Sequence, residues 1–280
     1  MNPQRLYSDV CAECARLVTH RYSTSFSMGI RLFEDALRAP IYAVYGFVRF
    51  ADEIVDTFHD HDKRQLLREF RRDTYAAIER GLSLNPVLHS FQETVTKYGI
   101  ERELIDAFLY SMELDIEHRA YERQLYDTYI YGSAEVVGLM CLRIFTHGRP
   151  GEYERLREPA KRLGAAFQKI NFLRDISSDF HDRGRVYFPG VSFAAFSDRQ
   201  KREIEAEIAE DFEAALVGIR ELPRGARLGV HCAYVYFRNL LTRIQQVEAR
   251  RIARERVRVP NAAKLSLMLG SAVRHRLNIL

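Results

Sequence analysis

Cysteine is scarce in this chain, and its few copies do not form a metal-binding pattern. The 280 residues contain four cysteines, at positions 11, 14, 141 and 232. Cys11 and Cys14 have a spacing that zinc ligands use, but no second pair accompanies them. A separation of three residues is ordinary packing on a helix, so we interpret this pair as structural. Nothing in the cysteine content requires an oxidising compartment.

Segments that would direct the chain into or across a membrane are also missing. No uninterrupted apolar stretch reaches the roughly 18 residues needed to span a bilayer. The first 18 residues include Arg5, Asp9, Glu13 and Arg16, which is not the pattern of a signal peptide. We therefore expect a cytoplasmic protein that can make peripheral contact with the inner face of a membrane.

Linkers, repeats and strand-like alternation are absent or rare. The sequence has no Ser/Gly linker, no low-complexity run and no internal repeat of about 20 to 50 residues, so we expect one domain over residues 1–280. Leu, Ala, Arg and Glu dominate, and apolar residues make up 47% of the chain. Because alternation of period two is rare, the pattern predicts an all-α protein.

Net charge is modest, at a formal +4, with an arginine excess toward the C-terminus. This balance suits anionic small molecules or an acidic lipid surface. Glu248 and Glu255 lie among the arginines and weaken a nucleic-acid interpretation, so we expect no nucleic-acid partner.

The most informative segment, residues 168–182, carries a polar stripe on a predicted helix. Carboxylates four residues apart repel each other and need a counter-charge. Oxygen ligands without His or Cys suit a hard cation such as Mg²⁺. The alternative is a solvated acidic face, but the apolar flanking residues leave little room for one. The stripe consists of Gln168, Asn171, Asp175, Asp179 and Asp182.

An upstream segment, residues 41–56, is apolar almost all round, which is typical of a buried helix. Its polar residues nevertheless share one face: Tyr45, Arg49, Asp52 and Asp56 follow each other at spacings of four, three and four. Buried charges need partners, so this stripe predicts a cavity. An Arg49–Asp52 ion pair is the simplest structural alternative, but it leaves Asp56 unexplained.

These two segments together resemble the squalene/phytoene synthase family. The resemblance rests on two Asp-x-x-x-Asp motifs, Asp52–Asp56 and Asp175–Asp179, and the second motif runs into Gly184–Pro189. The resemblance covers the chain from about Tyr22 to about Val259. It implies an all-α, single-domain helical bundle of the isoprenoid synthase type with a central cavity. It also implies a prenyltransferase that joins two prenyl diphosphates head to head.

The resemblance assigns roles to particular residues. Asp52, Asp56, Asp175 and Asp179 would hold two or three Mg²⁺ ions, with Mn²⁺ as an alternative. Tyr45 would flank the reactive cation. Residues expected to contact substrate are Ser23, Ser25, Phe26, Arg49, Asp115, Tyr129, Gln168, Asn171, Arg174 and Arg256.

Two of these assignments have structural alternatives. The hydroxyls near Ser23 could simply cap a helix, and Asp115 could be a paired core residue.

The expected tail cavity should be dry and aliphatic, with aromatic faces near the charge. We expect Phe26, Phe47, Val137, Leu139 and Phe167 to line it. The chain departs from the family pattern at three positions. Ser133 and Glu135 replace a valine and a glycine, and Phe237 replaces a tyrosine whose hydroxyl Tyr236 could supply.

The expected reaction condenses two C20 geranylgeranyl diphosphates to phytoene through a cyclopropylcarbinyl diphosphate. Ile30 in place of an aromatic residue favours this longer tail. The alternative uses two farnesyl diphosphates to give dehydrosqualene or squalene. NADPH is expected only for squalene, and the chain has no Gly-x-Gly-x-x-Gly. Remoter alternatives are a non-catalytic scaffold protein and a single-substrate terpene cyclase.

Overall fold

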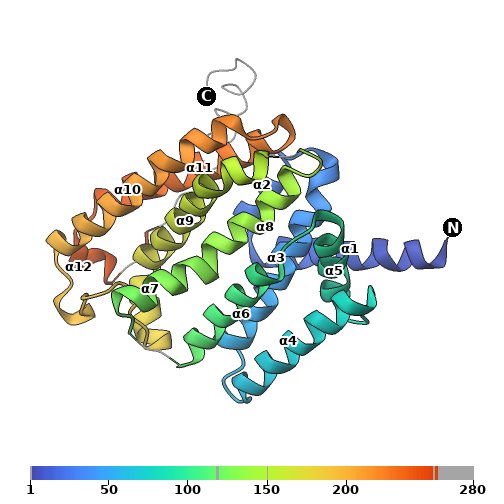
Figure 1. Cartoon of the computed structure of the whole chain (residues 1–280). Helices are drawn as coiled ribbons and strands as arrows, with labels where there is room; N and C mark the ends of the chain where they lie inside the picture. The colour runs from blue at the N-terminus through green and yellow to red at the C-terminus, as the bar shows by residue number, and fades with distance from the viewer. Residues whose placement is uncertain (1, 118–119, 150, 255, 258–280) are drawn as a thin grey trace.

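The computed structural model describes residues 2–117, 120–149, 151–254 and 256–257. This part of the chain is helical and contains no β-strand, only an isolated bridge between Ala120 and Val186 (Figure 1). The all-α prediction is therefore confirmed. The elements are α1 (Pro3–Tyr22), α2 (Thr24–Ile30), α3 (Asp35–Asp56), α4 (Lys63–Arg80), α5 (Pro86–Tyr98), α6 (Arg102–Glu117), α7 (Arg123–Ile130), the π-helix η1 (Tyr131–Glu135), α8 (Val136–Phe145), α9 (Glu152–Arg183), the 3₁₀-helix η2 (Phe193–Ala195), α10 (Asp198–Glu221), α11 (Arg224–Gln245) and α12 (Ala249–Ile252).

Several helix ends follow directly from local sequence. The Asp62 side chain accepts a hydrogen bond from the Gln65 amide and starts α4. Ser197 and Gln200, with the Ser-x-x-Gln spacing typical of a capping box, form one at the start of α10. Gly184 ends α9 with φ 64°, a conformation in which glycine carries no steric penalty.

The start of α3 differs from the sequence-based expectation. The predicted helical segment begins at residue 41, directly after Pro40, but α3 begins at Asp35 and Pro40 lies inside it. The φ angle of proline is already helical, but the missing N–H removes one backbone hydrogen bond and the ring crowds the carbonyl of Ala36. The expectation was therefore wrong by more than one turn. The helix ends at Asp56, so the first aspartate motif occupies its last turn.

The core beneath α3 is built from stacked phenylalanine rings. Phe47 lies parallel to Phe91 of α5 with ring centroids 4.0 Å apart, and it also contacts Phe70 of α4 and Phe108 of α6. Phe47 and Leu139 have no exposed surface. These two residues therefore pack in the core and do not line an open cavity, which corrects that part of the prediction.

Small residues bring three helical segments into close contact around η1. A methyl group added at Gly164 of α9 would lie 2.5 Å from the carbonyl oxygen of Ala134, and one at Gly138 would lie 2.8 Å from that of Ala160. Such distances are too short for a side chain. Glycine at these positions lets α9 pack directly on η1 and α8, and this contact fixes where the second aspartate motif lies.

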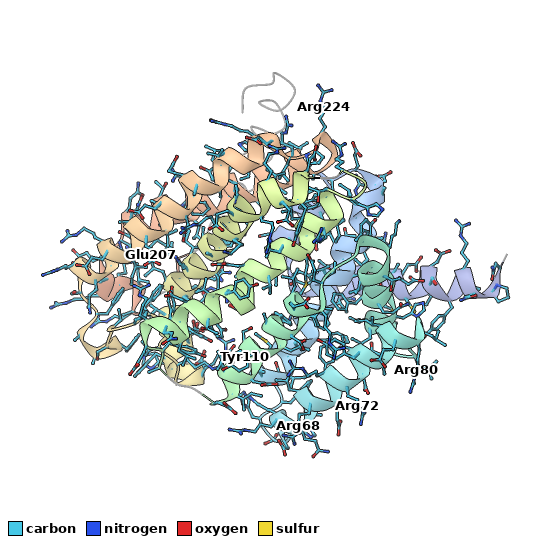
Figure 2. All side chains as sticks on the ribbon, viewed as in Figure 1. Arg68, Arg72, Arg80, Tyr110, Glu207 and Arg224 are labelled. Carbon is cyan, nitrogen blue, oxygen red and sulfur yellow. The ribbon has the colours of Figure 1, made fainter. Side chains whose placement is uncertain are left out.

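The outer helices carry much of the charge. Figure 2 shows Arg68, Arg72 and Arg80 pointing away from α4, as expected for a solvated face. Arg71 is the exception, because it pairs with Asp106 and Glu113 of α6. In the part of the chain described, no helix is both long and apolar enough to cross a bilayer. The single-domain prediction for residues 1–280 stays a prediction, since 258–280 lie outside the described residues.

Candidate active site

The last turns of α3 carry the first motif. Asp52 is partly buried, and burial raises its pKa to about 7, although Arg49 opposes the shift. Arg49 forms its ion pair with Glu53 and packs on the Tyr22 ring. The structural alternative, an Arg49–Asp52 ion pair, is therefore wrong, because Arg49 pairs with Glu53. The Nε atom of Arg49 is buried and has no hydrogen-bond partner among the described residues.

The second motif lies on α9, near its C-terminus. Asp175 forms ion pairs with two arginines. Its Oδ1 atom lies 2.9 Å from Nε of Arg174 and 2.7 Å from Nε of Arg256. Asp179 is only 7% exposed, and burial raises its pKa to about 7 against the opposing effect of Arg183. Arg174 and Arg256, both predicted to contact diphosphate, thus lie against the second motif.

One guanidinium group joins the two motifs. Arg183 places Nη1 2.7 Å from Oδ1 of Asp179 and Nε 3.4 Å from Oδ1 of Asp56. Arg185 places Nη1 2.9 Å from the same oxygen of Asp56. The sequence-based interpretation requires the motifs of α3 and α9 to face each other. The structure meets this requirement for Asp56 and Asp179, because a single side chain contacts both.

Asp115 of α6 is the centre of a buried hydrogen-bond network. Its Oδ1 accepts hydrogen bonds from the hydroxyls of Tyr121 (3.2 Å) and Tyr187 (3.0 Å), and its Oδ2 accepts one from Tyr129 (2.7 Å). Nη1 of Arg185 lies 3.7 Å away. Burial raises the pKa of Asp115, and Arg185 opposes the shift. Both carboxylate oxygens are already used, so contact with substrate by Asp115 or Tyr129 stays a prediction.

Three members of this arrangement were not predicted from the sequence. Tyr121 has no role in the sequence-based prediction, and Arg185 and Tyr187 enter it only as parts of the run Gly184–Pro189. The Tyr187 ring stacks on Phe172 of α9 with centroids 3.9 Å apart, and it lies 5.2 Å from the Tyr129 ring. The run Gly184–Pro189 was the available signal, but it does not reveal which side chains Asp115 meets.

The α2 region contacts α3 through a pair of aromatic rings. The rings of Phe26 and Tyr45 lie 5.7 Å apart, and Phe26 is 43% exposed. The Ser23 hydroxyl accepts a hydrogen bond from the Phe26 amide at 3.2 Å, so the helix-capping alternative is confirmed. A contact between diphosphate and Ser23 or the half-buried Ser25 stays a prediction.

The remaining predicted residues lie along α9 and α11. Gln168 and Asn171 are half-buried on α9, and their contact with diphosphate stays a prediction. Phe167 stacks on Phe237 of α11 with ring centroids 4.1 Å apart. At position 237, where the family pattern has a tyrosine, the phenylalanine ring therefore packs against another aromatic ring. Burial opposes the rise in the pKa of Arg174, which Asp175 and, to a smaller extent, Tyr236 cause.

The donor set fits a hard divalent cation, although the described residues contain no ready-made group of three or more His, Cys, Asp or Glu ligands. The motif side chains offer carboxylate oxygens only, which Mg²⁺ prefers. Arginines form ion pairs with three of these carboxylates: Asp56, Asp175 and Asp179. The buried Nε atoms of Arg49 and Arg185 lack hydrogen-bond partners, so donors for an anionic ligand are available beside the carboxylates.

A family model for squalene/phytoene synthases matches residues 19–263. The chain belongs to the squalene/phytoene synthase family. The matched region includes both aspartate motifs and agrees with the extent of the resemblance found in the sequence. Members of this family are prenyltransferases, so the predicted enzyme class is confirmed at the level of the family.

Relatives within the family differ in substrate. The chain is 34% identical to a presqualene diphosphate synthase of Rhodopseudomonas palustris, over 59% of this chain and 58% of that one. It is 29% identical to a 15-cis-phytoene synthase of Synechococcus elongatus, over 92% of this chain and 91% of that one. A 4,4'-diapophytoene synthase of Staphylococcus haemolyticus is 27% identical over 68% of this chain and 66% of its own length.

Solved structures establish the fold. A dehydrosqualene synthase superposes with a TM-score of 0.85 over 99% of this chain and 100% of that one, at 20% identity. A squalene synthase from Alicyclobacillus acidocaldarius superposes with a TM-score of 0.75 over 86% of this chain and 95% of that one, at 19% identity. The predicted isoprenoid-synthase-type bundle is therefore confirmed.

Proposed function

We propose that this protein catalyses the Mg²⁺-dependent head-to-head condensation of two geranylgeranyl diphosphates to phytoene, the first committed step of carotenoid synthesis. The observation that carries the proposal is the meeting of the two motifs, in which Arg183 contacts both Asp56 and Asp179. The match to the phytoene synthase of Synechococcus elongatus, which covers more than nine tenths of both chains, supports the C20 substrate.

The four motif aspartates would hold the metal ions and, through them, the diphosphate. Asp52, Asp56, Asp175 and Asp179 are the proposed ligands. When bound, Mg²⁺ would neutralise the diphosphate and act as a Lewis acid that makes it a good leaving group. Arg49, Arg174 and Arg256 would grip phosphate oxygens. The buried Nε of Arg49 supports this role, because it is a donor still without an acceptor.

The side chains near the motifs would protect the carbocation that remains. Tyr45 and Phe26 offer aromatic faces beside the first motif, and such faces stabilise a nearby cation. The Phe172 ring, stacked on Tyr187 with centroids 3.9 Å apart, would help to exclude water beneath the second motif. The acceptor's C2–C3 double bond then attacks the cation, and proton loss gives the cyclopropylcarbinyl diphosphate.

The second half of the reaction ionises this intermediate, rearranges it and loses another proton. Two diphosphates and two protons leave in total. Burial raises the pKa of Tyr45 and holds that of Tyr129 well above its usual value. Both phenols are therefore neutral and poor bases. This supports the departing diphosphate as the proton acceptor.

A second candidate uses two farnesyl diphosphates. It is favoured by the 34% identity to a presqualene diphosphate synthase, which is higher than the identity to the phytoene synthase but covers only 59% of the chain. NADPH would be required only if this route continued to squalene. The scaffold alternative is disfavoured because both carboxylate pairs are retained. A cytoplasmic location and a peripheral membrane contact for product release stay predictions.

The test is to incubate purified protein with Mg²⁺ and either geranylgeranyl or farnesyl diphosphate and to identify the hydrocarbon. Phytoene from the C20 substrate is the expected result. Presqualene diphosphate or a C30 hydrocarbon, formed only from the C15 substrate, would replace the first proposal with the second. No condensation product from either substrate would contradict both.

A further inference from the structure

We propose that Arg183 is a built-in counter-cation of the metal-free enzyme, which holds the two aspartate motifs together until metal ions displace it. The proposal rests on the proposed function, because it concerns the same carboxylates. It assigns to Arg183 a positioning role that neither motif reveals.

The geometry of Arg183 is that of a bridge. Its Nη1 atom lies 2.7 Å from Asp179, one helical turn earlier on α9, and its Nε atom lies 3.4 Å from Asp56 at the end of α3. Asp56 ends α3 and Asp179 lies on α9, so no contact within a single helix holds these two carboxylates together. Two carboxylates this close repel each other unless a positive charge lies between them.

Arg185 shares Asp56 but is held differently. It is 5% exposed, and Tyr187 and Asp115 lie 3.3 Å and 3.7 Å from its Nη1 atom. Moving it would leave a buried network incomplete, which is costly. The Arg183 side chain is 34% exposed and leaves the last residue of α9, directly before Gly184. Arg185 is therefore the fixed anchor of Asp56, and Arg183 is the more exposed of the two arginines that contact this carboxylate.

This division has two measurable consequences. A metal ion that binds Asp56 and Asp179 must break the contacts of Arg183 with these two carboxylates, so Arg183 lowers the apparent metal affinity. In the absence of metal, the same contacts link α3 to α9. Removing Arg183 should therefore tighten metal binding and, at the same time, destabilise the metal-free protein.

The experiment compares the full-length protein with R183A, R183K and R199A. Binding of Mn²⁺, without substrate, is followed by the electron paramagnetic resonance signal of the free ion, and melting temperatures are measured in EDTA and in Mn²⁺. R199A is the matched control: Arg199 makes an i,i+4 pair with Glu203 at 3.0 Å on α10, but its side chain is 85% exposed. R183K keeps the charge but cannot bridge two carboxylates with a planar fork.

For R183A we expect roughly tenfold tighter Mn²⁺ binding. This factor corresponds to the free energy of two partly exposed ion pairs, which metal binding no longer has to break. R183A should also melt at a lower temperature than the unmodified protein in EDTA, with the difference narrowed by Mn²⁺. R183K should bind Mn²⁺ with intermediate affinity, and R199A should change neither quantity.

Equal or weaker Mn²⁺ binding by R183A would overturn this inference alone, since the unmodified protein would still bind metal. Unchanged melting of R183A in EDTA would also overturn it, because the bridge would then carry no stability. Absence of Mn²⁺ binding by both proteins would overturn this inference together with the proposed metal site.

Discussion

Replacing Asp115 with Asn should destabilise the protein far more than the same replacement at a more exposed carboxylate with similar partners. Asp115 is 4% exposed and accepts hydrogen bonds from the hydroxyls of Tyr121, Tyr129 and Tyr187. Asn keeps one oxygen acceptor but turns the other into an amide donor that faces tyrosine hydroxyls. It also removes the negative charge beside the buried Arg185.

The expected cost follows from these contacts. Breaking a buried ion pair from one side costs about 3–5 kcal/mol, because the other charge stays buried. Arg185 retains Asp56 at 2.9 Å, so we expect the lower end of the range, about 3 kcal/mol. An unsatisfied buried tyrosine hydroxyl would add about 1 kcal/mol or more.

Asp106 of α6 provides the matched control. It accepts hydrogen bonds from the Tyr75 hydroxyl at 2.7 Å and from Arg71 at 2.9 Å, and its side chain is 42% exposed. Water can replace lost partners there, so D106N should cost no more than about 1 kcal/mol. The free energy of unfolding is obtained for both variants from urea titration followed by far-ultraviolet circular dichroism. Equal losses for D115N and D106N would refute the network that we assign to Asp115.

Three further predictions concern the motifs and the packing of α9. Asp175→Ala should abolish turnover while leaving the far-ultraviolet circular dichroism spectrum unchanged, and retained turnover would remove Asp175 from the site. The pKa values of Asp52 and Asp179 in the folded protein are raised from the ordinary 3.8 to about 7. The stability that these two carboxyls contribute to the metal-free protein is therefore fully present below about pH 4 and is lost as the pH rises through 7, where they ionise. Mg²⁺ affinity should show the opposite trend and rise through pH 7, because ligands must be ionised; a flat calorimetric titration series from about pH 6 to pH 8 would contradict this. Gly164→Ala should cost about 1–3 kcal/mol in urea titration by forcing α9 away from Ala134, and a neutral effect would mean that the close contact is not maintained in solution.

Much of the fold was predictable from local patterns. The acidic stripe on α9, the polar face of α3 and the capping box at Ser197 each depend on spacing within one helix, which the sequence displays directly. The cavity lining was predicted less well. Phe47 is two residues after Tyr45 and so points to another side of α3, where it stacks on Phe91. Its apolar character alone did not distinguish cavity from core.

The arginine and tyrosine contacts of the site could not be predicted by the same means. Tyr187 donates to Asp115 across 72 residues, and Arg185 reaches Asp56 across 129. Such contacts depend on how α6, α9 and the loop after α9 pack, and no sequence period encodes them. Pairing of the motif carboxylates with arginines was likewise hidden, because the sequence shows many arginines and does not say which one faces Asp179.

The central claim is that the aspartates of α3 and α9 hold metal ions and a diphosphate between them. The most direct test is anomalous X-ray diffraction at the manganese edge, from crystals grown with Mn²⁺ and an unreactive thiodiphosphate analogue of the substrate. We predict anomalous peaks between Asp56 and Asp179 and beside Asp52 and Asp175, with the diphosphate bridging them. Manganese peaks only elsewhere on the protein, with Arg183 still joining the two motifs, would contradict the account.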